Sequence, residues 1–423
     1  NIDWLENGTD IWVARPGAPI NLTQPLAAAR MRASAPRSYE SYVYASLRPH
    51  VVTAGNDGAL LDTGSYALTP EGVRSIVRDQ LPRTVKSWPK KRVMLYAHGG
   101  LVSQDSALQY AANYREACLK AQVYPIAFIW RSDFWTTIGD ILQDAVSTRK
   151  TEGFLDATKD FMLDRLDDTL EPVARALGGK ALWDEMKENA ELCASDKAGP
   201  KRNQEGAARL VAQHLVAAYR AKEIDEIHLV GHSAGSILLA PLAQYLADNK
   251  VPVSSLSLWA PACTLELFNS VYAPLIASNA IQAFDLYTLD DATEQDDDCA
   301  NIYHKSLLYF VSNAFEDKPH IPRLGPNGKP TKGTPILGMA RDAGTIPAAF
   351  WTPAKRQWIV APNSDQSHAR HHGDFDNDGK TLLSTLHRMT GGAKATSQTM
   401  VLKSPLARAA RVRAGVNAAL FTP

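Results

Sequence analysis

The sequence predicts an α/β fold in which a mostly parallel sheet is covered by helices. Three apolar runs, at 92–97, 123–130 and 227–230, have the length and the charged boundaries of buried strands. Strands of this kind, alternating with segments of helical periodicity, are typical of parallel sheets. With 423 residues, of which 45% are hydrophobic, the chain can form one such core with insertions.

The start of the chain is predicted to hold an arm and the first elements of the core. Residues 1–37 contain four prolines and no periodicity, which indicates an irregular arm on the surface. A strand is expected over 42–47, followed by a hairpin at the Asn-Asp-Gly turn of 56–58. A helix should begin at Thr69 and should end or kink near Pro82, because proline cannot donate a backbone hydrogen bond.

The predicted strand at 92–97 runs directly into His98-Gly99-Gly100-Leu101. Glycines in such a loop let the backbone approach a ligand closely and leave its amides free to point inward. A helix around Tyr110 and the strand at 123–130 follow, so the strand–helix–strand alternation continues.

Residues 131–200 interrupt this alternation with apolar residues at helical spacing and no strand pattern. The segment is rich in Phe and Trp and lies directly before the strand at 227–230. We expect it to form a helical cap or lid over a site, with an apolar or aromatic pocket beneath it. A solvated helical spacer is the alternative.

The stretch 227–241 predicts a strand, a sharp turn and a helix. Its turn, Gly231-His-Ser-Ala-Gly235, fits the pattern G-x-S-x-G with Ser233 at the apex. A serine in strained backbone geometry exposes its hydroxyl, and the two glycines leave room where the strand and the helix pass. The N–H of Ala234 then faces the site at the positive end of the helix dipole. An ordinary turn with a capping serine is the alternative.

Two more strands are expected after this turn, at 255–260 and 280–289. The second ends on Asp290 and Asp291, and the acidic run continues to Asp298. Residues 305–315 are predicted to be helical from the apolar face of Leu308, Val311 and Phe315. If they formed a strand instead, Glu316 and Asp317 would be the acids at its end.

A long loop rich in Gly and Pro is expected over 322–353, and the last strand over 357–361. Three histidines follow that strand: His368, His371 and His372. His372 is followed by glycine and by an Asp-Phe-Asp run that opens another helix.

The same segment contains two sets of residues that resemble metal ligands. The carboxylates of Asp374, Asp376 and Asp378 copy the first half of a calcium-binding EF-hand loop, but its twelfth position is Thr385 instead of glutamate. His368, His371 and Asp374 could bind zinc, although no H-E-x-x-H accompanies them. We therefore expect no metal and no cofactor, and we assign these carboxylates to an acidic helix start.

Taken in order, these motifs resemble the α/β-hydrolase superfamily and, within it, bacterial serine esterases and lipases. The resemblance covers about 42–389 and rests on the loop at His98, the turn at Gly231 and the His-Gly pair at His372. The chain departs from the family pattern in its long helical insertion and in its ambiguous acid. These departures leave the substrate and the acid open.

The resemblance implies a catalytic triad and an oxyanion hole. Ser233 would be the nucleophile, His372 the general base and Asp291 the acid that orients it. The oxyanion would be held by N–H groups of Ala234 and of Gly100 or Leu101. The open alternatives are Asp290 or Glu316 for the acid, and His371 or His368 for the base. His98 is expected to hold its loop.

The implied activity is hydrolysis of carboxylic esters through an acyl-enzyme on Ser233. The substrate would be a small-molecule or polymeric ester, and the aromatic insertion favours medium acyl chains or aromatic acids. An amidase, a thioesterase and a catalytically silent binding protein of the same fold are the alternatives.

The expected domain plan has an α/β-hydrolase core formed by 38–130 and 201–390, with the cap inserted between them at 131–200. The arm at 1–37 precedes the core, and a tail at 391–423, which carries a short basic stretch, follows it.

Composition excludes several classes of partner. Lys+Arg and Asp+Glu balance at 45 each, so neither nucleic acid nor an anionic membrane is expected to bind. No apolar run reaches the ~20 residues of a membrane span. The four widely spaced cysteines are expected to be buried thiols, with one disulfide left open. A cytoplasmic location is expected, or a secreted one if a leader has been removed, and the oligomeric state is open.

Overall fold

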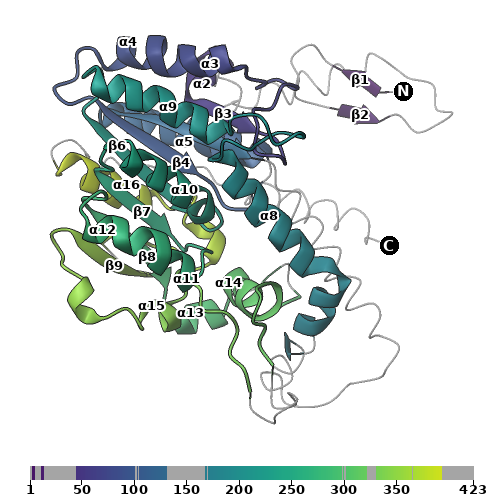
Figure 1. Cartoon of the computed structure of the whole chain (residues 1–423). Helices are drawn as coiled ribbons and strands as arrows, with labels where there is room; N and C mark the ends of the chain where they lie inside the picture. The colour runs from purple at the N-terminus through teal and green to yellow at the C-terminus, as the bar shows by residue number, and fades with distance from the viewer. Residues whose placement is uncertain are drawn as a thin grey trace. The chain divides into compact units, whose positions relative to one another are not determined.

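The computed structural model describes residues 2–4, 11–13, 44–100, 102, 104–130, 167–168, 170–297, 299, 302–321, 330–363 and 365–392 (Figure 1). The chain divides into two compact units, Asn1–Leu47 and Arg48–Pro423. The basic stretch of the tail and most of the predicted cap lie outside the described residues.

The first unit holds two short strands and one helical turn. Strands β1 (Ile2–Trp4) and β2 (Ile11–Val13) pair antiparallel, although an irregular arm was expected there. The strand predicted over 42–47 is wrong, because Tyr44–Leu47 forms the helical turn α2. Alanine and leucine favour helix, and four residues are too few for a period-two pattern to be distinguished from one helical turn.

The second unit is built on a parallel sheet of seven strands in the order β3-β5-β4-β6-β7-β8-β9. The strands are β3 (Val51–Ala54), β4 (Arg92–Ala97), β5 (Val123–Trp130), β6 (Glu226–His232), β7 (Ser255–Trp259), β8 (Phe284–Leu289) and β9 (Arg356–Ala361). Every neighbouring pair is parallel. This confirms the predicted α/β fold with a parallel sheet.

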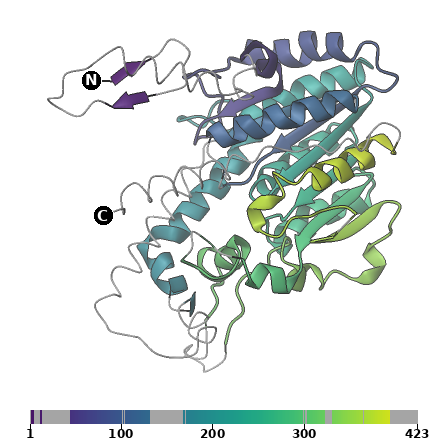
Figure 2. The same ribbon diagram turned by 180° about the vertical axis from the view of Figure 1, so that it is seen from behind.

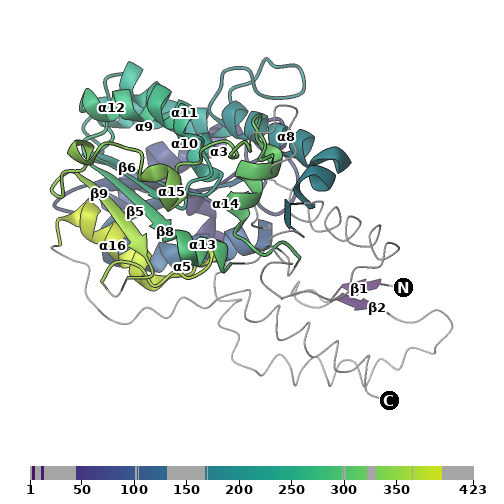
Figure 3. The ribbon, with the colours of Figure 1, turned by 90° about the horizontal axis from the view of Figure 1, so that it is seen from below.

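Helices cover both faces of this sheet. The longer ones are α5 (Gln104–Lys120), α8 (Lys180–Cys193), α9 (Ala207–Arg220), α10 (Gly235–Asp248) and α16 (Gly379–Thr390). Figure 3 shows α9 and α10 on one face and α5 and α16 on the other, and the view from behind in Figure 2 has α5 and α16 in front. A sheet covered in this way buries its strands on both sides, which explains their continuous apolar runs.

Shorter helical segments complete the second unit. They are η1 (Arg48–His50), α3 (Pro70–Ser75), η2 (Ile76–Gln80), α4 (Leu81–Val85), η3 (Arg175–Gly179), α11 (Leu265–Leu267), η4 (Phe268–Tyr272), α12 (Ala273–Ala277), α13 (Asp291–Gln295), α14 (Leu307–Phe310), η5 (Val311–Phe315), α15 (Ala340–Ala343), η6 (Ala348–Phe350) and η7 (His372–Asp374).

Local signals explain where two of the predicted helices begin. Thr69 caps α3 by accepting the N–H of Gly72, as predicted, and Ser306 caps α14 by accepting the N–H of Tyr309. Helix α14 and η5 together confirm a helix within 305–315. The helix from Thr69 does not end at Pro82. It passes through the π-helical turn η2, and Pro82 then occupies the first turn of α4, where a missing N–H costs least.

The order of the strands sets the place of a site. In the sheet, β5 lies on one side of β4. The next strand along the chain, β6, lies on the other side of β4. The loops that leave the carboxyl ends of β4 and β6 therefore diverge, and a crevice at such a switch point is where open parallel sheets bind ligands. The His98 loop follows β4, and the Ser233 turn follows β6.

The core carries no disulfide. Cys118, Cys193, Cys263 and Cys299 are all buried free thiols, which confirms the expectation of buried thiols. Within the part of the chain that the structure describes, no helix combines the length and the apolar character needed to cross a membrane.

Candidate active site

Ser233 stands on a sharply turned and strained backbone. Its φ of 49° lies in the left-handed region that non-glycine residues seldom occupy. The neighbouring strand β7 holds this geometry, because the N–H of Ser233 donates to the carbonyl of Trp259 at 2.9 Å. The carbonyl of Ser233 in turn accepts the N–H of Ala262 at 3.0 Å. The turn is therefore fixed from both sides.

The glycines of the turn are required by close packing. A Cβ on Gly235 would lie 2.1 Å from the carbonyl oxygen of Ala97, at the end of β4. Backbone cannot move aside as a flexible side chain can. A Cβ on Gly231 would lie 2.8 Å from a methyl group of Leu239 and 3.2 Å from the backbone of Gly235. The predicted reason for G-x-S-x-G at this place is thus borne out by the packing.

Ser233 and His372 are in hydrogen-bond contact. Nε2 of His372 lies 2.9 Å from Oγ of Ser233, although the two residues are 139 positions apart. Both are buried, with exposed fractions of 1% and 3%. Burial, and then the nearby charge of His232, holds the pKa of His372 well below its usual value. A neutral imidazole at this place can accept the serine proton.

The predicted acids lie elsewhere. Asp291 accepts a hydrogen bond from the hydroxyl of Tyr309 at 2.7 Å, and Asp290 caps α13 by accepting the N–H of Thr293 at 2.8 Å. Glu316 accepts the indole N–H of Trp183 at 2.6 Å. No contact recorded among the described residues joins these carboxylates to His372. For Asp290 the physical reason is the helix that opens directly after β8, since its first turn uses the carboxylate as a cap.

Asp297 is the carboxylate that reaches the His372 segment. It lies in the loop after β8, is 5% exposed, and accepts the backbone N–H of His372 at 2.8 Å. Its other oxygen lies 2.7 Å from Nδ1 of His371. Nδ1 of His372 itself has no hydrogen-bond partner among the described residues. The sequence places Asp297 in a long acidic run but offers no signal that singles it out.

The His98 loop packs directly on the serine turn. A Cβ on Gly99 would lie 3.0 Å from Cβ of Ser233, and one on Gly100 would lie 3.5 Å from Cβ of Ala234. Gly100 and Ala234, two of the predicted oxyanion donors, are therefore neighbours beside the nucleophile. The third, Leu101, lies outside the described residues.

His98 ties its loop to β5. Its Nδ1 lies 2.7 Å from the carbonyl of Gly99, and its Nε2 accepts the backbone N–H of Trp130 at 3.3 Å. The indole N–H of Trp130 donates back to the His98 carbonyl at 3.2 Å. Burial lowers the pKa of His98 to about 4, so the ring is neutral. These contacts agree with the predicted role of holding the loop.

The three carboxylates that copy half of a calcium loop, where no metal is expected, bond to separate partners. Asp374 accepts the backbone N–H groups of Arg370 and His371, and Asp378 caps α16 and accepts the N–H of His368. Asp376 pairs with His232 instead. Across the described parts of the chain, the group with the spacing of metal ligands is Asp168, Glu171 and His320, which contains none of the predicted site residues.

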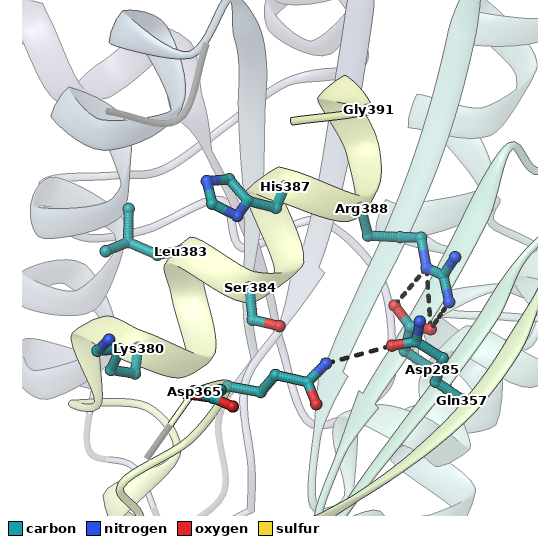
Figure 4. Close-up of a pocket in the computed structure, with 10 residues that line it drawn as sticks. Asp285, Gln357, Asp365, Lys380, Leu383, Ser384, His387, Arg388 and Gly391 are labelled. Atoms are coloured by element: carbon teal, nitrogen blue, oxygen red, sulfur yellow. Dashed lines mark hydrogen bonds and ion pairs between the residues drawn. The ribbon is translucent and has the colours of Figure 1, made fainter. Parts of the chain in front are cut away.

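A surface cavity of about 390 Å³ lies away from this centre (Figure 4). It is bounded by α16 and by the strands β8 and β9, with the ion pair of Arg388 and Asp285 on one wall. None of the predicted site residues lines it. The serine–histidine contact at the switch point is therefore the better candidate for a reactive site.

Comparison with family models, curated proteins and solved structures finds no match for this chain. The argument for function therefore depends on the geometry of the site.

Glu294 is a buried acid of helix α13, which directly precedes the loop that carries Asp297. One of its oxygens accepts the hydroxyl of Ser306, and the other has no hydrogen-bond partner among the described residues. Burial raises the pKa of Glu294 to about 8, against the opposing hydrogen bond from Ser306. The carboxyl group is thus protonated at neutral pH in the folded protein.

Glu294→Gln should stabilise the protein increasingly as the pH rises from about 5 to 8. In this window the unfolded chain releases the Glu294 proton that the folded protein retains, so the contribution of this group to wild-type stability falls by about 1.4 kcal/mol per pH unit. Glutamine removes that loss. Urea unfolding at several pH values measures it, with Asp296→Asn, an exposed acid of the same loop, as the control. Parallel stability curves for wild type and Glu294→Gln would contradict the assignment.

Proposed function

We propose that this protein is a serine hydrolase of the α/β-hydrolase superfamily that cleaves carboxylic esters. The observation that carries the proposal is the 2.9 Å contact between Oγ of Ser233 and Nε2 of His372. Ser233 lies on a strained turn at the switch point of a parallel sheet. In the α/β-hydrolase pattern, a turn of this kind exposes the nucleophilic serine.

The proposed reaction begins when Ser233 attacks the acyl carbon and His372 takes its proton at Nε2. The N–H of Ala234, at the start of α10, and an N–H of the Gly99–Gly100 loop would stabilise the oxyanion. His372 then donates the proton to the departing alcohol, leaving an acyl-enzyme. Water attacks this ester, again with His372 as the base, and releases the acid.

We assign the orienting acid to Asp297 in place of Asp291. Asp297 lies after β8, in the loop where the family places this residue, and its hydrogen bond to the main chain fixes the backbone of His372. When Oγ of Ser233 donates to Nε2, the proton of neutral His372 sits on Nδ1. A buried N–H without an acceptor costs about 1–3 kcal/mol, and Asp297, which already bonds the backbone N–H of the same residue, is the acceptor that we propose for it.

Helix α8 supports an apolar substrate pocket. A Cβ on Gly100 would lie 2.5 Å from Sδ of Met186, so α8 reaches the loop beside the nucleophile. Trp183 of the same helix is buried and bonded to Glu316. These residues belong to the segment that we propose as the cap, and the Phe and Trp content of that segment is our reason for proposing a medium acyl or aromatic acid group. Amides and thioesters are the alternative substrates. The alternative that is not an enzyme is a catalytically silent binding protein of the same fold.

A fluorophosphonate probe should label the purified protein on Ser233, and p-nitrophenyl esters should be hydrolysed. Ser233→Ala should abolish labelling and lower turnover by roughly 10⁴-fold or more. Ser270→Ala, which removes an exposed hydroxyl of η4, serves as the control for labelling. Absence of both labelling and ester hydrolysis in folded wild-type protein would rule out the proposal, and a panel of amides and thioesters would separate the alternatives.

His372→Ala should abolish turnover, whereas His371→Ala should have a mild effect, because only His372 contacts Ser233. The pH profile tests the same assignment. Protonation of the base on the acid side stops catalysis, and the pKa of His372 is lowered, so kcat/KM should fall only below the ordinary histidine value of about 6.5. An acid limb centred above 6.5 would contradict a buried neutral base.

Asp297→Asn should lower kcat by on the order of 10²-fold or more, because His372 loses its orienting charge. Asp291→Asn should stay within a few-fold of wild type, since that carboxylate bonds to Tyr309. Both variants should remain folded by circular dichroism. The reverse ranking, with Asp291→Asn inactive and Asp297→Asn active, would restore Asp291 as the acid.

A further inference from the structure

His232, the residue before the nucleophile, lies where three loops meet. Its Nε2 is 3.0 Å from the backbone carbonyl oxygen of His372, and its Nδ1 is 2.7 Å from a carboxylate oxygen of Asp376. A Cβ on Gly99 would lie 3.0 Å from the same Nδ1. The side chain therefore contacts the serine turn, the His98 loop and the segment that carries the base.

The surroundings of His232 place an oxygen that can accept a proton near each of its ring nitrogens. A carbonyl oxygen only accepts, so Nε2 must carry a proton to bond His372. Nδ1 lies 2.7 Å from a carboxylate oxygen of Asp376, but the two groups are not aligned for a hydrogen bond. We therefore treat this contact as an electrostatic one. The side chains of His232 and Asp376 are 4% and 1% exposed. A buried carboxylate needs a positive partner, and His232 is the one in contact with it.

The carboxylate of Asp376 is itself held in place. The hydroxyl of Tyr96 donates to its other oxygen, and the hydroxyl of Tyr114 donates to its backbone carbonyl at 2.6 Å. Tyr96 belongs to β4 and Tyr114 to α5, so the pair is anchored to the sheet and to the helix that covers it. This arrangement leaves His232 little freedom to turn away from His372.

The ring of His232 also lies beside the ring of the base, with their centroids 5.1 Å apart. The other titratable groups that face His372 are Ser233 from the turn, Asp297 from the loop after β8, and His371 and Asp374 from its own segment. Near His232, Tyr96 bonds its partner Asp376, and His98 is close enough for the two histidines to interact electrostatically. A positive charge on His232 opposes a second positive charge on His372.

We propose that His232 is a positioning residue of the reaction. Held as an imidazolium by Asp376, it fixes the backbone of His372 through its Nε2–H and keeps the base in its neutral form. This proposal rests on the proposed function, but the state of the two rings can be measured without turnover.

Two substitutions separate the positional and the electrostatic parts. Glutamine can place a donor near Nε2 of the histidine, so His232→Gln keeps the bond to His372 and loses the charge. Asparagine reaches only the Nδ1 position, so His232→Asn loses both. His228→Gln is the matched control, because His228 is a buried histidine of the same strand that bonds Ser255, away from the site.

His232→Gln should keep kcat within a few-fold and move the acid limb of kcat/KM upward by roughly one pH unit. His232→Asn should show the same shift and also lose about tenfold or more in kcat. His228→Gln should leave kcat and the limb unchanged. A wild-type pH profile in folded His232→Gln, or wild-type kcat in folded His232→Asn, would overturn the proposal.

Nuclear magnetic resonance of the ¹⁵N-histidine-labelled protein provides the readout that does not depend on activity. Both ring nitrogens of His232 should carry a proton while the His372 ring is neutral, and the pKa of His372 should rise in His232→Gln. A singly protonated His232, or an unchanged His372 titration, would overturn the proposal even in a fully active enzyme. If wild type fails to hydrolyse esters while these signals are as expected, the proposed function fails and the charge arrangement of His232 stands.

Discussion

The left-handed backbone at Ser233 is the constraint on which the rest of the site depends. Two main-chain hydrogen bonds, to Trp259 and from Ala262, hold a conformation that the residue would otherwise avoid. Strain of this kind costs of order 1–3 kcal/mol and persists only where the surroundings enforce it. Here the hydrogen bond to β7 holds the strained conformation. Because Gly235 has no side chain, the turn can pack directly against the carbonyl of Ala97.

The central sheet and the serine turn could be predicted because their signals are local. Strands buried on both faces must be apolar throughout, so β4, β5 and β6 are visible as runs in the sequence. The glycines at 231 and 235 are required by contacts that any tight strand–turn–helix unit makes. The place of His372 could be predicted too, because it follows the last parallel strand, whose carboxyl end lies at the same edge of the sheet as that of β6.

The orienting acid could not be predicted in this way. Asp290 and Asp291 stand at the end of β8, but the first turn of α13 and the hydroxyl of Tyr309 take up their carboxylates. Asp297 reaches His372 only because the chain turns back after α13, and no spacing in the sequence encodes that return. The role of Asp376 was missed for a similar reason, since its partner His232 lies on a strand far away in the chain.

The same centre shows why polar groups are placed in an otherwise apolar region. Asp376, His232 and Tyr96 are nearly inaccessible to water, and each would be costly to bury alone. Together they contact one another and join β4 to β6 and to the segment after β9. Networks of this type specify one arrangement more strictly than apolar packing does, because a half-satisfied network is penalised.

The pairing of the central strands bears on how this fold can change in evolution. Arg92 pairs with Val123 across β4 and β5 and with Glu226 across β4 and β6, the second partner being 134 positions away. Closing the longer loop costs only about 1.2 kcal/mol more, since the entropy grows with the logarithm of loop length. The chain between β5 and β6 can therefore lengthen or shorten at little thermodynamic cost. Because Ser233 and His372 follow the ends of strands β6 and β9, the chain between β5 and β6 can change in length while their contact stays in place.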